Sequence, residues 1–367
     1  MNVMDEEKTS NESYNYGENK IWCNGKCISG KKYYYLFFTF LFYSIPFLML
    51  LIILFKIKNI SSFIFTKIFL FTLYFLETYS SFRSGFTDPG IIPRQKDDQA
   101  IPIKKSQGKC VIRGHLFNLS YCTTCNLFKP PRSSHCLLCN NCIQKRDHHC
   151  MWLGDCIGKR NYKFFYLFIF SFMIGIIYQI SFCIYILLST IIKGKYDKFI
   201  TLAIIITMSF IVFYDVSFLI LFFFKLFCFH SFFCIQNLTA YEYNKNKKWF
   251  GFNPFNKNFC YNFKNIFCKK ERKTYIFDTP SEINKITTNT IIYNVKVIQV
   301  RETTENSLNA DNSNMKNLNS ENKLNWRWLS KLNYFYNRML LLIYIRIKKY
   351  KYYKLIQRLT NIIRIIF

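Results

Sequence analysis

Residues 122–156 read CTTCNLFKPPRSSHCLLCNNCIQKRDHHCMWLGDC, and this stretch decides how the rest of the chain is interpreted. It holds seven of the 15 cysteines and three of the five histidines of the 367-residue chain. Repeated cysteine pairs with histidine at such spacings are typical of zinc sites, because four ligands must converge on each ion. Two closed sites of three cysteines and one histidine would leave one thiol and one imidazole unused. A thiol beside an imidazole suits nucleophilic catalysis.

Four long apolar segments surround this stretch, two before it and two after it. A helix needs about 20 mostly apolar residues to cross a bilayer, and each segment reaches that length. The second segment is the least apolar, because Lys67 and Glu77 interrupt it. Asp215 in the fourth segment is a further charge, to which the sequence alone assigns no role. We predict an α-helical polytopic membrane protein with four transmembrane helices, at 33–55, 60–81, 164–192 and 199–224.

Charge and thiol content indicate how these helices are oriented. The loop at 82–163 carries 14 Lys and Arg residues, against two at 56–59 and three at 193–198. By the positive-inside rule this loop and both termini face the cytosol, whose reducing conditions also suit so many thiols. The first 32 residues contain no apolar run, so we expect no cleavable signal peptide.

The formal net charge of +29 has two interpretations. It can favour binding to the anionic cytosolic leaflet of a membrane. It can also reflect compositional drift in a chain rich in Lys, Asn, Ile, Phe and Tyr. Because membrane spans are predicted, nucleic acid is the less suitable partner in either case.

Changes in composition divide the chain into six segments. The Asn-, Thr- and Ser-rich stretch from about 274 to 322 is expected to be loose in solution. The stretch at 324–367 alternates apolar and basic residues. It is either an amphipathic helix that lies on a membrane surface or a tail whose composition has drifted without a role. We predict a cytosolic N-terminal segment at 1–32, a transmembrane hairpin at 33–81, a cytosolic loop at 82–163 with a zinc-binding core at 120–163, a second hairpin at 164–227, a juxtamembrane segment at 228–273, and a linker and tail at 274–367.

The order C-x2-C-x9-HC-x2-C-x2-C-x4-DHHC-x5-C resembles the cysteine-rich domain of the DHHC protein S-acyltransferases, or palmitoyltransferases. Motifs outside the cysteine pattern extend the resemblance to roughly residues 33–267. They are the basic-Pro-x-Arg run Lys129-Pro130-Pro131-Arg132, Trp152 after the DHHC run, Cys156-Ile157-Gly158 leading to Asn161-Tyr162 and Phe165, the DPG motif Asp88-Pro89-Gly90, the TTxE-like Thr239-Ala240-Tyr241-Glu242, and the aromatic–Asn segment Asn253-Pro254-Phe255 with Asn262.

The resemblance implies two interleaved structural zinc ions. Each would have four protein ligands and no open coordination position, so neither would take part in the chemistry. The first would be held by Cys122, Cys125, His135 and Cys142, and the second by Cys136, Cys139, His149 and Cys156.

The resemblance also implies the reaction and its catalytic residues. Cys150 would attack the thioester of a fatty acyl-CoA such as palmitoyl-CoA, with His148 as the base and Asp147 orienting it. A cysteine of a membrane-associated substrate protein would then take the acyl group in the second half of a ping-pong cycle. An endomembrane, Golgi or ER, is expected rather than the plasma membrane.

Basic side chains near Cys150 are candidates for contact with anionic coenzyme A, and ordinary positive-inside charge is the alternative. Trp152 would pack on the first carbons of the acyl chain, and Cys228 and Cys234 could themselves be acylated. The basic candidates are Lys129, Arg132, Arg146 and Arg160, together with Lys145 and Lys159.

Three positions depart from the pattern: Asp155 and Asn256 differ from the usual residues, and Ala240 replaces a Thr whose hydroxyl would steady the catalytic loop. The sequence speaks against two other functions. A non-enzymatic membrane scaffold would have no need of a surplus thiol and imidazole. A membrane-tethered zinc finger for nucleic acid or the ubiquitin pathway would need a groove-reading helix or a docking face, and the sequence has the signature of neither.

Overall fold

The computed structural model describes residues 17–56, 64–94, 109–112, 115–194, 197–219, 224–245, 253–269 and 274. The chain divides into two compact units, and the first, Met1–Lys245 with Pro254–Val297, contains every helix and strand described below. The loose linker and the amphipathic tail that the sequence predicts after residue 274 lie outside the described residues.

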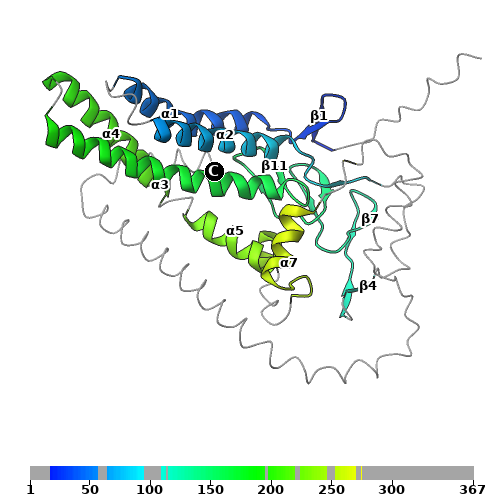
Figure 1. Ribbon diagram of the computed structural model, residues 1–367. Helices are drawn as coiled ribbons and strands as arrows, with labels where there is room; N and C mark the ends of the chain where they lie inside the picture. Colours follow the sequence, from blue (N-terminus) through cyan, green and yellow to red (C-terminus); the bar gives the residue numbers. More distant parts are fainter. Residues whose placement is uncertain are drawn as a thin grey trace, which may run out of the picture. The chain divides into compact units, whose positions relative to one another are not determined.

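Four long helices pack side by side (Figure 1). By length and composition, three of the helices in the described part of the chain can cross a membrane, over Tyr34–Phe55, Tyr162–Ile192 and Lys198–Phe218. The helix at the second predicted span is not among them, since Lys67, Glu77 and a run of hydroxyl residues lower its hydropathy. The four helices are α1 (Tyr34–Lys56), α2 (Ile64–Phe86), α3 (Tyr162–Lys193) and α4 (Lys198–Phe218).

The fourth predicted span, at 199–224, corresponds to α4, which ends at Phe218. A further helix, α5 (Phe224–Gln236), follows it. Residues 220–223 lie outside the described residues, so the predicted end of this span stays a prediction.

A proline ties the first helix to the fourth. Pro46 lies inside α1 and has no N–H to donate, so the carbonyl of Phe42, four residues earlier, loses its helical partner. The hydroxyl of Tyr214 in α4 donates to that carbonyl at 3.1 Å. The carbonyl that the proline frees is thereby satisfied by a neighbouring helix. The bundle core beside it includes the fully buried Leu50, Leu54, Met208 and Ile211.

Between α2 and α3 the chain forms short antiparallel strands instead of a large sheet. So small a region buries little apolar surface, and its cysteines make up much of its core. Strands β3, β9 and β8 form one sheet, and β4–β5, β6–β7 and β10–β11 form pairs. The strands are β3 (Ile91–Ile92), β4 (Lys109–Ile112), β5 (His115–Asn118), β6 (Tyr121–Cys122), β7 (Leu127–Phe128), β8 (Ser134–Cys136), β9 (Asn141–Ile143), β10 (His148–Cys150) and β11 (Asp155–Ile157).

A hairpin before the first helix packs on this cysteine-rich region, although it lies outside the resemblance. It consists of β1 (Lys20–Trp22) and β2 (Cys27–Ser29). Just before β1, the backbone N–H of Glu18 donates to the carbonyl of Cys139 at 2.9 Å. Asn19 donates to Oδ1 of Asp155 at 3.1 Å, so the hairpin supplies a partner for the acid that departs from the family pattern.

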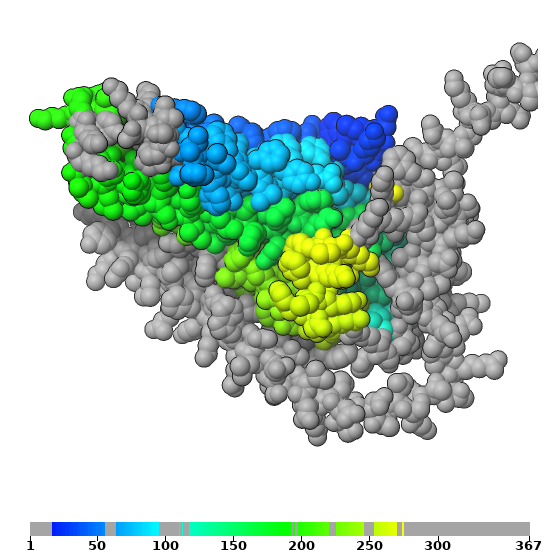
Figure 2. All heavy atoms as spheres, in the orientation of Figure 1, coloured from blue at the N-terminus to red at the C-terminus, as the bar shows by residue number. Residues whose placement is uncertain are grey.

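The segment after α5 folds back on the end of that helix. It contains α6 (Ala240–Lys245), α7 (Phe259–Phe263) and a π-helical turn, η4 (Lys264–Cys268). Buried Asn262 donates to the carbonyl of Ile235 at 2.7 Å and to Oδ1 of Asn256 at 2.6 Å. Asn256 donates in turn to Gln236 at 2.9 Å. Figure 2 shows the segment in yellow against the green surface of α3 and α5.

Candidate active site and metal clusters

Four predicted ligands of the first zinc ion converge in one cluster: Cys122, Cys125, His135 and Cys142. The two cysteines of the β6–β7 turn face His135 and Cys142, which lie directly opposite each other on β8 and β9. The three sulfur atoms lie 3.5, 3.5 and 3.8 Å from Nδ1 of His135. Ligands of a tetrahedral zinc ion, with ordinary Zn–S and Zn–N bonds, would lie about 3.6 Å apart. The cluster therefore has the dimensions of such a site.

The other four predicted ligands form a second cluster: Cys136, Cys139, His149 and Cys156. The distances from Nδ1 of His149 to the three sulfur atoms are 3.7, 3.3 and 3.7 Å. His149 and Cys156 are cross-strand partners on β10 and β11. In both clusters the chemistry of the donors fits a zinc ion bound by three thiolates and one imidazole.

Cys150 and His148 belong to neither four-residue cluster. The reason lies in the strand that carries them. Side chains on a β-strand alternate between its two faces, so His149 points one way while His148 and Cys150 point the other. One face of β10 thus contributes to the second metal cluster, and the opposite face presents a thiol and an imidazole.

Asp147 holds the imidazole of His148. Its Oδ2 lies 2.7 Å from Nδ1 of His148, which fixes the proton on that nitrogen and leaves the other ring nitrogen available. Burial acts to raise the pKa of Asp147, but the hydrogen bond from His148 and the nearby imidazoles outweigh it and lower that pKa. Burial acts to lower the pKa of His148, but its hydrogen bond with Asp147 and its interaction with Cys150 raise it to about 10.

The thiol of Cys150 is buried at the end of the helix bundle. Its apolar neighbours come from two helices and from the loop that follows it, and include Leu36 of α1, Leu153, and Phe165 and Ile169 of α3. The ring of Phe165 also meets the ring of His148 edge-on, with centroids 5.1 Å apart. The candidate nucleophile therefore lies where the polar cysteine-rich region meets the apolar helices.

His230 of α5 is a buried histidine at this site that the sequence did not reveal. One polar atom from each of Asp147, His148 and His230 lies within 4.8 Å of the others. Its Nδ1 lies 3.2 Å from the hydroxyl of Tyr162, and burial lowers its pKa to about 4. No motif pointed to it, because a single histidine in an apolar helix is more often a core residue.

Asp147 is held on its other side by the TTxE-like segment. The backbone N–H of Ala240 donates to Oδ1 of Asp147 at 2.8 Å. Thr239 and Glu242 form a capping box around the start of α6: Thr239 Oγ1 accepts from the N–H of Glu242 at 3.1 Å, and Glu242 Oε2 accepts from the N–H of Thr239 at 2.9 Å. The box fixes the direction of the Ala240 N–H.

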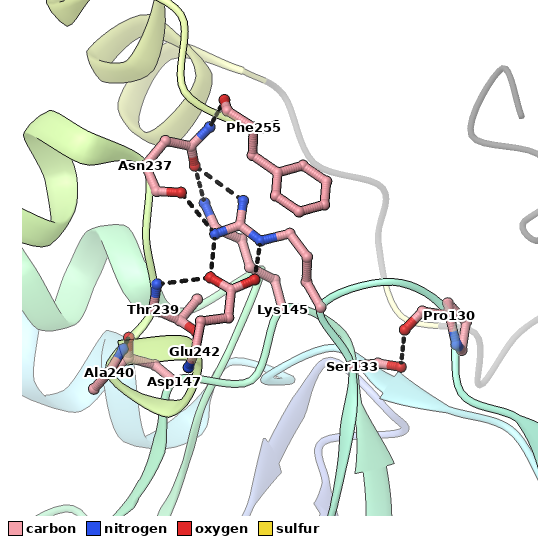
Figure 3. Close-up of polar contacts among 10 residues, drawn as sticks. Pro130, Ser133, Lys145, Asp147, Asn237, Thr239, Ala240, Glu242 and Phe255 are labelled. Atoms are coloured by element: carbon pink, nitrogen blue, oxygen red, sulfur yellow. Dashed lines mark hydrogen bonds and ion pairs between the residues drawn. The ribbon is translucent and has the colours of Figure 1, made fainter. Parts of the chain in front are cut away.

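Arg132 locks this capping box to the cysteine-rich region through Glu242 and Asn237, both labelled in Figure 3. Its Nε and Nη2 donate to the two carboxylate oxygens of Glu242 at 2.7 and 2.8 Å, which is a bidentate ion pair. Its other donors reach the side chain and the carbonyl of Asn237 at 3.1 and 2.8 Å. The guanidinium also lies 4.5 Å from the centre of the Phe255 ring. Three segments distant in sequence thus meet at one arginine.

A cavity of about 300 Å³ lies beside Arg132 and is lined by basic side chains. Lys145 lines it and donates to Oδ1 of Asn237 at 3.2 Å (Figure 3). Burial first, and then the charge of Arg132, lower the pKa of Lys145 to about 7. Lys159, Lys257 and Lys269 also line the cavity, and the last two were not expected from the sequence, since they lie about 110 residues from the cysteine pattern.

The predicted coenzyme A contacts lie in different surroundings. Of the six basic candidates, Arg132, Lys145 and Lys159 line the basic cavity, whereas Lys129, Arg146 and Arg160 are not among its lining residues. Arg146 stacks 5.5 Å from the ring centre of Tyr241, and Arg160 is buried in an ion pair with Asp88.

Trp152 and the two cysteines predicted to be acylated differ in their exposure. The ring of Trp152 lies 6.2 Å from that of Phe42 and is partly exposed. Cys228 is partly buried, whereas Cys234 is buried with its sulfur 3.6 Å from the hydroxyl of Tyr162.

Comparison with known proteins gives concordant results. The family model described as DHHC palmitoyltransferase matches residues 115–247. A probable protein S-acyltransferase 6 of Arabidopsis thaliana is 36% identical over 196 residues, which are 49% of this chain and 47% of that protein. Palmitoyltransferase ZDHHC14 of Mus musculus is 31% identical over 178 residues, 42% of this chain and 35% of its own. Palmitoyltransferase ZDHHC9 of Pongo abelii is 31% identical over 136 residues, 31% of this chain and 36% of its own.

The matches span less than half the length of these curated relatives. The family-model match at 115–247 includes the cysteine-rich region and the TTxE-like segment, the two parts that meet at Asp147. Residues 115–247 of this chain are therefore a DHHC palmitoyltransferase domain.

Proposed function

We propose that this protein is a membrane-bound protein S-acyltransferase that moves a fatty acyl group from acyl-CoA to substrate cysteines through a thioester on Cys150. The observation that carries the proposal is that β10 directs its metal ligand and its candidate catalytic residues to opposite faces. His149 enters a metal cluster, while Cys150 and His148 share the opposite face, beside Asp147. The printed names of the relatives, which are palmitoyltransferases and an S-acyltransferase, support the same activity.

In the first half-reaction Cys150 reacts as the thiolate of a thiolate–imidazolium pair. Its proton lies on His148, whose pKa is raised to about 10, and Asp147 stabilises this imidazolium. The thiolate attacks the carbonyl carbon of the acyl-CoA thioester. The bond from that carbon to the sulfur of coenzyme A breaks, and the departing thiolate recovers the proton from His148. In the second half, a substrate thiol gives its proton to His148 and attacks the acyl-enzyme, which frees Cys150.

The acyl chain would extend from Cys150 into the helix bundle. The apolar side chains of Leu36, Phe165 and Ile169 around the thiol support this direction. Each methylene buried there is worth about 0.8 kcal/mol, so a long chain contributes much of the binding free energy. Trp152, partly exposed beside α1, would pack on the first carbons of the chain.

Two zinc ions would bind the clusters of Cys122, Cys125, His135 and Cys142 and of Cys136, Cys139, His149 and Cys156. Each cluster offers four protein ligands, which leaves no position for substrate or water, so the ions would be structural. Their binding free energy would fold a region that buries little apolar surface, and loss of a ligand would unfold that region.

Coenzyme A would lie against basic side chains near Cys150, and Lys129, Arg132, Arg146 and Arg160 remain the proposed contacts. Arg132 is favoured by its place on the wall of the 300 Å³ cavity. Arg160 would have to bind coenzyme A while keeping its ion pair with Asp88.

We also propose that α2 is a fourth membrane span. Lys67 and Glu77, the charges that lower its hydropathy, are only 9% and 7% exposed, so they face protein rather than lipid. The exposed side of α2 is apolar, with Phe65, Ile68 and Phe75 on it. Four spans place both termini and the cysteine-rich region on one side, the cytosolic one, in an endomembrane. Substrates would be membrane-associated proteins with cysteines near that surface.

The purified full chain, incubated with an alkyne-tagged palmitoyl-CoA, tests this proposal. We expect a label on the protein that hydroxylamine removes, and that is absent from Cys150→Ser. Elemental analysis should find two zinc ions per chain in both proteins. Equal labelling of the Cys150→Ser variant would refute the acyl-enzyme, and a zinc content near zero would refute the ligand sets.

A further inference from the structure

The helix bundle encloses a small polar cavity, away from the cysteine-rich region. Its lining includes two acids and an amide, Glu77 from α2, Gln179 from α3 and Asp215 from α4. These side chains are 7%, 8% and 2% exposed, in a bundle whose other interior residues are mostly apolar. Ionisable residues inside a membrane bundle are costly and are commonly retained for binding or transport of a charge.

The backbone of α3 makes room for one of the acids. Gly175 has no side chain, and a Cβ atom built there would lie 2.3 Å from Oε1 of Glu77. The carboxyl group therefore rests directly on the helix at a position where even alanine would displace it.

Polar atoms in this cavity lack partners. Nε2 of Gln179 and Oδ2 of Asp215 are buried without a hydrogen bond from any described residue. No salt bridge within the described ranges involves Glu77 or Asp215. An unpaired carboxylate costs several kcal/mol to bury, and an unpaired amide about 1–3 kcal/mol. A ligand that satisfies these groups is therefore the expected occupant.

The dimensions of the cavity restrict that ligand. Its volume of about 20 Å³ accommodates one particle the size of a water molecule. The two carboxyl groups and the amide offer about five oxygens once the amide turns its oxygen inward, and that turn breaks no hydrogen bond. Oxygen ligands of this kind select hard cations. Magnesium usually keeps several waters and calcium takes six to eight oxygens, so both demand more than this site contains.

We propose that this cavity binds one sodium-sized monovalent cation between the carboxyl groups of Glu77 and Asp215, with the amide of Gln179 as a third ligand. The bound ion joins α2, α3 and α4 and so stabilises the bundle. Potassium should bind less tightly, because sodium is the smaller ion and lets the carboxylate oxygens approach its charge more closely. The proposal does not depend on the acyltransferase activity.

Thermal unfolding of the full-length protein in lipid nanodiscs, followed by tryptophan fluorescence, tests the site. Sodium chloride, potassium chloride and N-methyl-D-glucamine chloride are compared at equal ionic strength. Sodium should raise the melting temperature by about 2–4 °C in a saturable manner, and potassium should raise it less. The same shift is expected in Cys150→Ser, which separates this test from that of the catalytic proposal.

Three variants test whether the sodium-dependent rise in melting temperature arises at this cavity. Glu77→Gln and Asp215→Asn remove a charge at nearly constant shape, and Gly175→Ala displaces the Glu77 carboxyl group without changing any charge. All three should lose the sodium-dependent shift, whereas Asp197→Asn, at the exposed start of α4, should keep it.

If a variant fails to fold, binding of radioactive sodium to the wild-type chain decides the matter, with about one displaceable ion per chain expected. Equal melting temperatures in sodium and N-methyl-D-glucamine, with no bound sodium, would overturn the proposal and leave a carboxyl pair that holds only protons. A sodium shift that survives in Glu77→Gln and Asp215→Asn would also overturn it.

Discussion

The backbone N–H of Ala240 lies 2.8 Å from Oδ1 of Asp147 and donates a hydrogen bond to it, across 93 residues of sequence. At this position the sequence suggested a loss, because a Thr hydroxyl of the family pattern is missing. A backbone N–H needs no particular side chain, so the alanine keeps this support for the catalytic loop. Ala240 is the first residue of α6, where N–H groups have no helical partner and the helix dipole favours a carboxylate.

Replacing Ala240 by proline should impair catalysis with little effect on folding. Proline is well accepted at the first position of a helix, but it has no N–H to donate to Asp147. We expect self-acylation with palmitoyl-CoA to slow roughly tenfold, the equivalent of about 1.4 kcal/mol for one hydrogen bond to a charged group. Ala240→Thr keeps the N–H and serves as the matched control. Equal rates for the two variants would show that the contact does not support His148.

The Arg132–Glu242 ion pair should contribute stability as well as orientation. Glu242→Ala leaves the Arg132 guanidinium buried without its partner and removes half of the capping box. We expect a loss of about 3–5 kcal/mol in the free energy of unfolding, together with slower self-acylation. Glu242→Gln retains an acceptor for Arg132 and for the Thr239 N–H, so it should lose less. The measurement is chemical denaturation followed by tryptophan fluorescence, and similar losses in both variants would contradict the role of the charge.

Arg160 allows a structural role to be separated from substrate binding. It is buried beside Asp88, whose other carboxylate oxygen accepts the N–H groups of Gly90 and Ile91 at 2.7 and 2.9 Å. Arg160→Met leaves the Asp88 carboxylate without its counter-ion, and we expect the free energy of unfolding to fall by about 3–5 kcal/mol. Because Arg160 is also a proposed coenzyme A contact, the KM for palmitoyl-CoA of the folded fraction should rise as well. An unchanged KM would show that Arg160 has a structural role only.

Lys145 should make stability depend on pH. Its pKa in the folded protein is lowered to about 7 by burial and by Arg132, against about 10.4 when unfolded. Between these values the unfolded chain binds more protons than the folded chain, so the free energy of unfolding rises with pH. The slope is at most about 1.4 kcal/mol per pH unit, and the contribution is flat below pH 7.

Denaturation midpoints of the wild type and of Lys145→Met, compared from pH 6 to pH 9.5, isolate this contribution from other titrating groups. The difference between the two proteins should shift in favour of the wild type as pH rises. A constant difference across the range would show that Lys145 does not titrate there.

Some features followed from the sequence because they depend on local pattern. Three apolar runs are long enough to be recognised as membrane helices. The structure forms two of them, Tyr34–Phe55 and Tyr162–Ile192, close to their predicted limits, and the third begins at Lys198, next to its predicted start. The count of thiols and imidazoles indicated a surplus pair, and the family resemblance then named Cys150 and His148. The placement of those two side chains on one face of β10 agrees with this prediction, but the catalytic assignment itself stays a prediction.

Other features were missed because distant segments create them. His230 reaches Asp147 only because α5 packs beside α3. The hairpin before α1 carries no known motif. The Asn19 side chain reaches Asp155 only because the adjoining backbone of Glu18 hydrogen-bonds to the carbonyl of Cys139.

By itself, then, the sequence determined the composition of the site. It contains enough thiols and imidazoles for two closed metal clusters, with one thiol and one imidazole left over, and it lies between apolar segments. Only the tertiary structure decided what holds Asp147, which is a backbone N–H of Ala240 fixed by Glu242 and Arg132. The physical reason is that metal-ligand sets and membrane spans depend on which types of residue follow one another at short spacing in the sequence. A hydrogen bond from a main-chain group is open to any residue except proline, and its partner depends on how the chain folds.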